Sequence, residues 1–357
     1  MRPEYILKHA ALLADYCLEV QKGQRVLIGS STLALPLVEE LFRAVLERGA
    51  EPILKLEYPG QSSDYTRLAD LELLSTVHPT RLTELESVHS SLRILTPHLG
   101  VPVESARVQR QNQANTSLNE IRRGKRWCIT LYPTALGAEL AEMTYPEYAD
   151  FVAGAMFLNF PNPVAKWLEV REFQAGLVER LSRTKEVRLV SAETDIKMRT
   201  DARVWRNSDG LRNMPSGEVF TSPLEDSPEG TIFFDVPTMY AGQKVSGIRL
   251  ELKGGKIARA SAEEGNEVLQ SALETDPGAR FLGEIGIGSN YGIGRSIREI
   301  LFDEKIGGTV HLAVGSSYRE CGGLNESAIH WDMICDLRKG GEIWLDGELF
   351  QRDGVFV

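Results

Sequence analysis

The arrangement of apolar residues changes near residue 185 of this 357-residue chain, and this change is the strongest constraint on its fold. Before it, apolar residues recur at helical spacing in segments that alternate with short apolar runs. After it, short apolar segments are separated by Gly, Asn, Asp and Pro, which is typical of strands and turns. The sequence therefore predicts an α/β domain over residues 1–185 and a mostly antiparallel β (α+β) domain over residues 186–357.

The first fifty-odd residues predict a strand-helix-strand unit. Apolar side chains in residues 6–20 recur at three- and four-residue steps, which predicts a helix. Residues 25–29 form an apolar run that is typical of a buried strand, and residues 53–56 form another. Between them, Pro36 suits the first turn of a second helix.

Two dipeptides in the second half predict β-hairpins. Gly254-Gly255 and Asp346-Gly347 each separate two short apolar runs. Two-residue hairpin turns require positive φ angles, which glycine and aspartate tolerate better than most residues. Adjacent strands in this half are therefore expected to run antiparallel.

Composition restricts the partners and the location of the protein. Hydrophobic residues make up 42% and charged residues 25%, as in ordinary globular proteins, and the net charge of -10 argues against a nucleic-acid partner. No apolar stretch reaches the roughly 18 residues of a membrane span. The four cysteines show no CxxC spacing, which favours a reducing compartment. We therefore expect a cytoplasmic protein that binds neither nucleic acid nor a membrane.

The most informative stretch is His330-Trp331-Asp332 in the apolar run 328–335. In a strand, alternation places His330 and Asp332 on one face and Trp331 on the other. An imidazole beside a carboxylate forms half of a metal site. Taken alone, this tripeptide is better explained by a histidine that is hydrogen-bonded on the surface of a sheet than by a metal ligand.

Further candidate ligands lie in the same half of the chain. The chain has only six histidines, and a second one, His311, begins another apolar run. Carboxylates recur at Glu218 and Glu284, each directly after a glycine, and at Glu304. Histidine with aspartate and glutamate suits zinc, cobalt or manganese. The four carboxylates Glu218, Glu284, Glu304 and Asp332 carry about four negative charges, which match two divalent cations better than one.

Five segments of the second half resemble, in order, the metal-site motifs of the thermophilic metalloaminopeptidases of the aminopeptidase T and aminopeptidase S type. These segments are Met214-Pro215-Ser216-Gly217-Glu218-Val219-Phe220-Thr221-Ser222-Pro223, Leu282-Gly283-Glu284, Leu301-Phe302-Asp303-Glu304, His311-Leu312-Ala313-Val314-Gly315 with Tyr318, and Ser327-Ala328-Ile329-His330-Trp331-Asp332. The resemblance covers most of residues 185–357 and, more loosely, the N-terminal half.

This resemblance implies an activity and a full set of site residues. Two divalent metal ions would be bound by Glu218, Glu284, Glu304, His311, His330 and Asp332. The enzyme would be a homodimer that removes N-terminal residues from peptides with a free N-terminus, by means of a water activated between the metals. Tyr318 resembles the family's active-site tyrosine and would steady the oxyanion, and our own hypothesis is that Glu284 is the second catalytic residue and moves a proton to the leaving amine.

One segment departs from the family pattern. The family places its Asp-Glu pair closer to the following histidine, whereas here residues 305–310 intervene and lengthen the loop by about two residues. The glycines of this loop let the backbone bend so that Glu304 reaches a metal, or Glu304 instead supports another ligand.

Two other functions share most of these residues. A metal-dependent amidase or dipeptidase would use every ligand and differ only in its substrate pocket. A non-catalytic metal-binding protein would bind metal tightly without turnover. The glycine-rich segment 283–294 contains neither a Gly-x-Gly-x-x-Gly motif nor a following Lys-Ser/Thr, so a nucleotide-binding loop is not expected there.

Overall fold

Contacts divide the chain into two compact units. The computed structural model describes residues 1–357, apart from the side chain of Ser105. The first unit comprises Met1–Trp167 and Gly210–Pro215, and the second comprises Leu168–Asp209 and Ser216–Val357. These units differ from the expected domains in that residues 168–185 belong to the second unit and residues 210–215 to the first.

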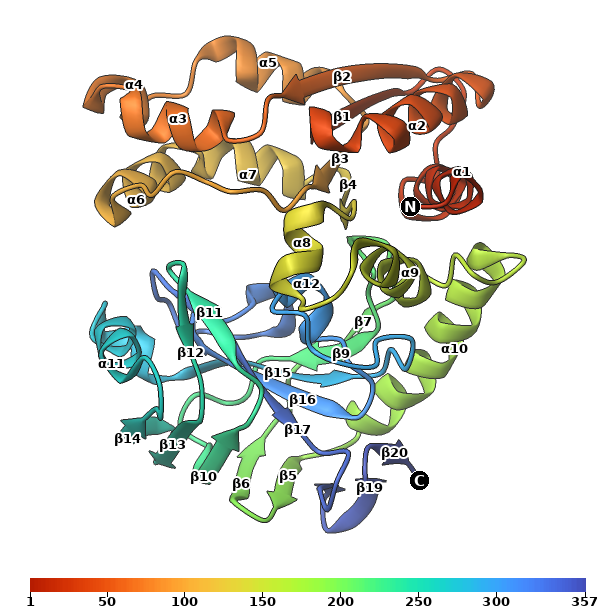
Figure 1. Ribbon diagram of the computed structural model, residues 1–357. Coiled ribbons are helices and arrows are strands. Elements are labelled where there is room, and N and C mark those ends of the chain that lie inside the picture. Colours follow the sequence, from red (N-terminus) through yellow and green to blue (C-terminus); the bar gives the residue numbers. More distant parts are fainter. The chain divides into compact units, whose positions relative to one another are not determined.

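The first unit contains a parallel sheet with the strand order β2-β1-β3-β4-β8, of which Figure 1 labels β1 to β4. The strands are β1 (Arg25–Ser31), β2 (Glu51–Glu57), β3 (Ser90–Leu95), β4 (Arg126–Leu131) and β8 (Asn213–Met214). Every neighbouring pair in this sheet is parallel, so each pair requires a crossover connection. The expected strand-helix-strand start of the chain is confirmed.

Helices precede β1 and connect the strands that follow it along the chain. They are α1 (Pro3–Leu12) with a continuing turn over Leu13–Cys17, α2 (Leu35–Glu47), α3 (Gln61–Leu68), α4 (Leu71–Ser75), α5 (Pro79–Ser87), α6 (Ser105–Ala114), α7 (Thr116–Arg123), α8 (Ala135–Leu140), α9 (Tyr145–Ala155) and α10 (Pro163–Leu181). Pro36 lies in the first turn of α2, as expected, and α2 packs on β1 and β2. None of the helices among the described residues is long and apolar enough to cross a membrane.

A buried histidine makes the first unit sensitive to acid. His9 is fully buried, its Nε2 lies 2.9 Å from Thr130 Oγ1, and burial lowers the pKa of its imidazole to about 3. The unfolded chain takes up this proton below about pH 6.5 and the folded chain does not, so stability should fall as pH falls from 6.5 towards 3. We expect a loss approaching about 1.4 kcal/mol per pH unit over that range.

Urea unfolding midpoints of the wild type and of His9→Leu, compared between about pH 6.5 and 4, measure this contribution. The variant should lose less stability on acidification than the wild type. Parallel pH profiles of the two proteins would contradict the assignment.

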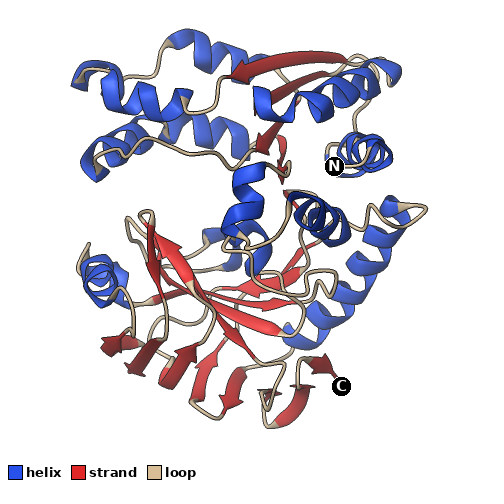
Figure 2. Cartoon of the chain, in the orientation of Figure 1, coloured by secondary structure: helices blue, strands red, loops and turns tan.

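The second unit is built mostly from antiparallel strands (Figure 2). A five-stranded sheet has the order β17-β16-β15-β9-β7, and an eight-stranded sheet has the order β14-β13-β10-β6-β5-β18-β19-β20. The strands of the first are β7 (Arg206–Ser208), β9 (Glu218–Thr221), β15 (Leu282–Gly288), β16 (Thr309–Gly315) and β17 (His330–Asp336). Those of the second are β5 (Glu186–Ser191), β6 (Thr194–Arg199), β10 (Glu229–Phe234), β13 (Ile248–Lys253), β14 (Lys256–Ser261), β18 (Glu342–Leu345), β19 (Glu348–Arg352) and β20 (Val355–Phe356).

One hydrophobic core joins the two sheets of the second unit. Ile285 and Leu312 from the five-stranded sheet belong to the same buried cluster as Leu189 and Leu250 from the eight-stranded sheet. A small hairpin of β11 (Thr238–Tyr240) and β12 (Gln243–Val245) and the helices α11 (Asn266–Leu273) and α12 (Ile300–Asp303) complete the unit.

Both predicted hairpins are present. Gly254 and Gly255, with φ angles of 56° and 80°, connect β13 to β14. Asp346 and Gly347, with φ angles of 50° and 86°, connect β18 to β19. Positive φ at both turn positions is the geometry that two-residue hairpins need. The expected fold class, an α/β region followed by antiparallel sheets, is therefore confirmed.

Candidate metal centre

Four neighbouring strands carry five of the predicted ligands. Glu218 opens β9, Glu284 lies in β15, His311 in β16, and His330 and Asp332 in β17. These strands are adjacent in the five-stranded sheet. Alternation along β17 leaves His330 and Asp332 partly exposed and buries Trp331, as expected, and the indole of Trp331 donates to Thr238 Oγ1 at 3.3 Å.

Small residues between the ligands make room for them on this face of the sheet. Ala313 pairs with Glu284 on one side and with Asp332 on the other. Gly286 pairs with His311, and a Cβ atom added to Gly286 would lie 2.0 Å from His311 Cε1. The imidazole therefore occupies the space that a side chain at position 286 would take.

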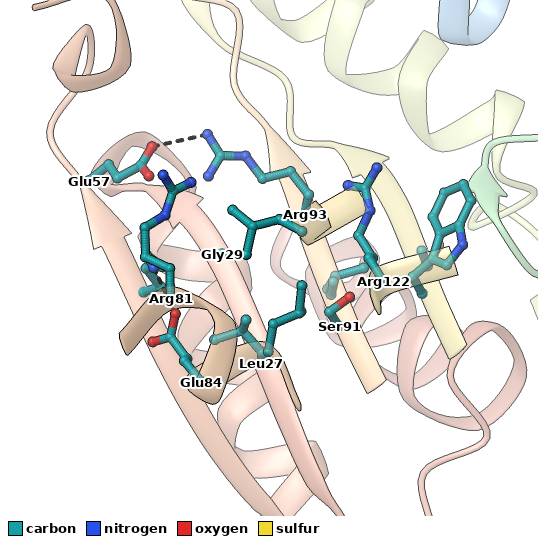
Figure 3. A pocket seen from close by; sticks show the side chains of 14 residues that line it. Leu27, Gly29, Glu57, Arg81, Glu84, Ser91, Arg93 and Arg122 are labelled. Carbon is teal, nitrogen blue, oxygen red and sulfur yellow. Dashed lines mark hydrogen bonds and ion pairs between the residues drawn. The ribbon is translucent and has the colours of Figure 1, made fainter. Parts of the chain in front are cut away.

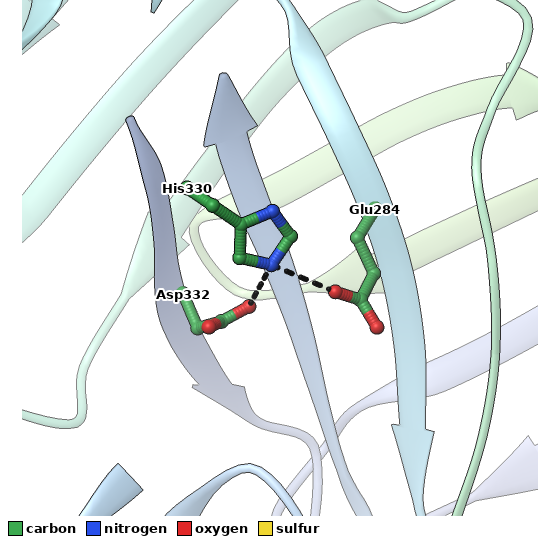
Figure 4. A group of neighbouring side chains, drawn as sticks. All are labelled: Glu284, His330 and Asp332. Atoms are coloured by element: carbon green, nitrogen blue, oxygen red, sulfur yellow. Dashed lines mark ion pairs between the residues drawn. The ribbon is translucent and has the colours of Figure 1, made fainter. Parts of the chain in front are cut away.

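The ligand atoms are close together. Single donor atoms of Glu284, His330 and Asp332 all lie within 4.8 Å of one another, and Figure 4 shows their side chains converging. His330 Nε2 is 3.1 Å from Glu284 Oε2 and 3.6 Å from Asp332 Oδ1. His311 Nε2 is 3.5 Å from both Glu284 Oε1 and Glu218 Oε2. Glu284 therefore lies between the two imidazoles.

Backbone carbonyls orient both imidazoles. His311 Nδ1 lies 3.0 Å from the carbonyl oxygen of Glu304, and His330 Nδ1 lies 2.8 Å from that of Ser316. A carbonyl oxygen only accepts hydrogen bonds, so each Nδ1 must carry the proton and donate it. The Nε2 atom of each neutral imidazole then has a free lone pair directed at the carboxylates. Proteins commonly hold metal-ligating histidines in this way.

The carboxylates have unsatisfied oxygens. Glu218 Oε2 and Asp332 Oδ1 are buried and make no hydrogen bond to any described residue, although they lie 3.5 Å and 3.6 Å from the Nε2 atoms of His311 and His330. A buried carboxylate oxygen without a partner is costly, and a bound cation removes that cost. Oxygen and imidazole donors together suit a divalent ion such as zinc, cobalt or manganese. The residues present therefore fit a divalent metal.

The carboxylates also control the protonation of the imidazoles. Burial by itself lowers the pKa of both imidazoles, but the neighbouring carboxylates outweigh it and raise the pKa of His311 to about 10 and of His330 to about 11. The same contacts hold the pKa of Glu284 and Asp332 below the usual range despite their burial. Without metal, protons on the histidines neutralise the cluster. Metal binding must displace these protons.

Unlike the other five predicted ligands, Glu304 does not lie on a strand of the five-stranded sheet. It directly follows α12, and its carboxylate forms an ion pair with the ammonium of Lys305. Burial first, and then the charges of Glu218 and Asp332, raise the pKa of Glu304 to about 8 against the opposing effect of Lys305. The structure therefore places Glu304 near the other predicted ligands, but with a cation already bound to it.

Metal-free protein should become less stable as pH rises from about 6.5 to about 10. The folded state retains protons on His311 and His330 that the unfolded state releases above about pH 6.5, so their contribution is complete below that pH and is lost as pH passes 10 and 11. Glu304 acts in the same direction up to about pH 8. Bound metal replaces these protons, so the stabilisation by metal should grow with pH.

Melting temperatures measured in chelator and in excess zinc at several values between about pH 6 and 9 test this expectation. The two curves should diverge as pH rises. A metal-free curve that is flat or rises over that range would contradict it.

Sequence reasoning missed two residues of this segment. Asp303 Oδ1 accepts a hydrogen bond from the backbone N–H of Ile297 at 2.9 Å, and its Oδ2 accepts one from Ser296 Oγ at 2.6 Å, so Asp303 holds the local loop. Lys305 is fully buried and forms ion pairs with Glu304 and Glu218. The sequence gives no signal of this burial, because Lys305 directly follows two other charged residues, Asp303 and Glu304, as it would on an exposed turn.

Tyr318 lies beside the ligands, as predicted. Its hydroxyl is 3.4 Å from His330 Nε2, and its ring packs edge-on against Phe220 with centroids 5.3 Å apart. Although the residue as a whole is 36% exposed, burial around its hydroxyl, together with the charges of Glu284 and Asp332, raises the pKa of Tyr318 well above its usual value. The phenol therefore stays protonated and is available as a hydrogen-bond donor.

The first unit contains a separate cavity of about 240 Å³ between β1 to β4 and the helices α5 and α7. Figure 3 shows arginine and glutamate side chains in its wall. Arg93 pairs with Glu57 at 3.0 Å and Lys55 with Glu84 at 2.7 Å, so both wall carboxylates are neutralised by cations. These paired carboxylates are poor candidates for metal ligands, and the cluster of the second unit remains the stronger candidate site.

Comparisons with known proteins agree with this geometry. The family model described as thermophilic metalloprotease (M29) matches residues 3–355. The chain belongs to this family. Aminopeptidase 2 of Geobacillus stearothermophilus is 26% identical over 92% of this chain and 90% of its own length. Aminopeptidase AmpS of Bacillus subtilis is 25% identical over 91% of both chains. Aminopeptidase T of Thermus aquaticus is 35% identical over 41% of this chain and 38% of its own.

Two solved structures share the fold of this chain. The structure of wild-type AmpT from Thermus thermophilus has a TM-score of 0.83 at 22% identity and covers 99% of both chains. A 2,5-dihydroxypyridine dioxygenase from Pseudomonas putida KT2440 has a TM-score of 0.59 at 16% identity and covers 99% of this chain and 96% of that one. Both likenesses concern the fold alone.

Membership of the M29 family confirms two predictions from the sequence. The resemblance to the thermophilic metalloaminopeptidases is confirmed, and so is the expected class of enzyme, a metal-dependent peptidase of the aminopeptidase kind. The family also implies a divalent metal cofactor. The individual roles of the site residues stay predictions.

Proposed function

We propose that this enzyme removes N-terminal residues from peptides that have a free α-amino group, with a divalent metal bound by the cluster of the second unit. The observation that carries the proposal is the convergence of Glu284, His330 and Asp332, with all three donor atoms within 4.8 Å. Membership of the thermophilic metalloprotease family supports it, as do relatives named aminopeptidases.

The surrounding carboxylates suit a substrate with a positive charge. Carboxylate oxygens of Glu218, Glu284, Glu304 and Asp332 that are not bound to a cation would accept hydrogen bonds from the α-ammonium group of a peptide. An N-acetylated peptide has no such charge. The cluster would therefore favour cleavage next to a free N-terminus.

Two side chains have the chemistry for acid-base and oxyanion roles. A divalent cation bound here would supply a Lewis acid that lowers the pKa of water and polarises a peptide carbonyl. Glu284, between the two imidazoles, would accept the proton of the attacking water and pass it to the leaving amine. Tyr318 would donate its phenolic proton to the developing oxyanion.

A cavity of about 300 Å³ in the loop between β16 and β17 would suit the rest of the peptide. All eight residues that line it lie between 316 and 326, and one of them is Ser316, whose carbonyl oxygen orients His330. Arg319 and Glu326 lie at its rim as an exposed ion pair. Glu326 is thus better suited to contact substrate than to act as the general base.

Several finer expectations accompany the proposal. The charge count and the family resemblance predict two metal ions, bound by six residues: Glu218, Glu284, Glu304, His311, His330 and Asp332. Zinc, cobalt or manganese would suit these donors. A homodimer in the cytoplasm, with peptides as substrates, stays the expected setting.

Hydrolysis of aminoacyl-p-nitroanilides and short peptides tests the function. The purified enzyme would be assayed as isolated, after chelation, and after addition of zinc, cobalt or manganese. We expect activity that chelation removes, that metal restores and that N-acetylation of the substrate abolishes. Activity that survives complete chelation would contradict a metal-dependent mechanism.

The same assay separates the two alternative functions. Turnover of other small amides, with peptides left uncleaved, would favour a metal-dependent amidase or dipeptidase. Tight metal binding without turnover of any substrate would favour a non-catalytic metal-binding protein.

A further inference from the structure

Lys305 is an unusual residue to find beside a metal site. Its side chain is 0% exposed, and its ammonium forms an ion pair with Glu304 Oε1 and lies 3.4 Å from Glu218 Oε1. Its backbone N–H donates to the carbonyl of Phe302 at 3.0 Å, and its own carbonyl accepts from Asn290 N–H at 3.0 Å. These two hydrogen bonds fix the backbone of Lys305, so its side chain starts from a defined position beside the cluster.

The ammonium occupies the position that a second metal ion would need. A buried ammonium without a counter-ion is very costly, so Lys305 depends on Glu218 and Glu304. These are two of the carboxylates that the two-metal prediction assigns as ligands. Metal to carboxylate-oxygen bonds are about 2.0–2.2 Å long. An ion held by the same two oxygens would therefore lie directly against the positively charged Nζ.

Lys305 also changes the charge count that favoured two ions. When all four carboxylates are ionised they carry about four negative charges, and the ammonium supplies one positive charge inside the same cluster. One divalent ion then leaves about one negative charge, and two ions leave about one positive charge. The net charge therefore no longer favours two metal ions over one. The position of the ammonium then decides the number of ions.

We infer that Lys305 takes the place of the second metal ion, so that this enzyme binds one divalent ion per chain. Glu284, His330 and Asp332 hold that ion, because their donor atoms converge and Asp332 Oδ1 has no other hydrogen-bond partner among the described residues. Glu304 serves as the counter-ion of Lys305 and not as a metal ligand. The inference rests on the metal centre of the proposed function and replaces its prediction of two ions.

Metal content of the wild-type enzyme is the first test. Chelated protein would be dialysed against manganese, cobalt, zinc or iron(II), and bound metal would be measured by mass spectrometry. We expect one equivalent per chain, and an electron paramagnetic resonance spectrum of the manganese form that is typical of an isolated ion. Two equivalents with a spin-coupled spectrum would overturn the inference.

Two substitutions test the role of the ammonium by the same measurement. Lys305→Ala removes the ammonium and leaves space between Glu218 and Glu304, so bound metal should rise from one equivalent to two. Lys339→Ala, at an exposed lysine of the same unit, should stay at one. A Lys305→Ala protein that folds and binds one ion would overturn the inference.

A second variant decides the question if Lys305→Ala fails to fold. Glu304→Gln removes a ligand in the two-metal arrangement but only a counter-ion in the arrangement inferred here. Metal content should therefore stay at one equivalent in Glu304→Gln, and a fall from two equivalents to one would support two metals.

The outcomes also separate this inference from the proposed function. An active aminopeptidase with two ions would overturn the inference and leave the function standing. A protein that binds one ion but has no peptidase activity would overturn the proposed function and leave the inference standing.

Discussion

His330→Ala should lose bound metal and peptidase activity together. The imidazole supplies one of the three converging donor atoms, and its Nδ1 is fixed by Ser316, so alanine removes both a ligand and its support. Loss of groups that merely orient ligands typically costs 10- to 100-fold in metal affinity or activity, and loss of a ligand should cost at least about 100-fold. Metal content after dialysis and kcat/KM on an aminoacyl-p-nitroanilide measure the two effects.

A histidine outside the cluster supplies the control. His78 is exposed in the first unit, where its Nδ1 accepts from the backbone N–H of Thr80 at the start of α5. His78→Ala should keep its metal and its activity, with at most about 1 kcal/mol of stability lost through the helix cap. Full activity in His330→Ala would refute the assignment of the site.

Gly286→Ala should displace His311 and destabilise the second unit. The added methyl group would lie 2.0 Å from Cε1 and 2.2 Å from Nε2 of the imidazole, far inside van der Waals contact. Gly286 is on a buried strand between two neighbours, so the backbone has little freedom to move away. Overpacking of a close-packed interior costs about 1–3 kcal/mol, and loss of metal affinity should add to it.

Gly294→Ala is the matched control for this change. No heavy atom lies within 4 Å of a Cβ atom built at Gly294, and its φ is not positive. Its unfolding midpoint and metal content should equal those of the wild type. If Gly286→Ala had the same unfolding midpoint and metal content as Gly294→Ala, the tight packing between Gly286 and His311 would be refuted.

Local patterns predicted much of the fold. Alternation around Trp331 correctly placed His330 and Asp332 on one face of β17, because a strand with one buried face has little choice of register. The turn dipeptides at 254–255 and 346–347 likewise specified their hairpins. Residues 213–214 were not predicted to return to the first unit, since a strand as short as β8 is defined by its pairing with β4 and carries almost no periodic signal.

The sequence identified the candidate ligands of the site, but it did not identify the buried lysine that changes the net charge of the site. Histidines and carboxylates are recognisable as potential ligands wherever they occur, whereas a lysine is usually exposed, and nothing local showed that Lys305 is buried. Its burial follows from the turn after α12 and from the contact with Asn290, which join distant segments. Such long-range contacts are invisible to spacing rules.

The placement of the ligands within the sheet affects how the enzyme tolerates loss of its metal. Glu284 and His311 lie on interior strands whose amides are hydrogen-bonded to neighbours on both sides, whereas His330 and Asp332 lie on β17 at the end of the sheet order. Interior strands open mainly through global unfolding, so their amide hydrogens should exchange slowly with solvent even after chelation. The sheet would therefore stay folded after the metal is removed, and the metal-free enzyme could bind metal again without having to refold.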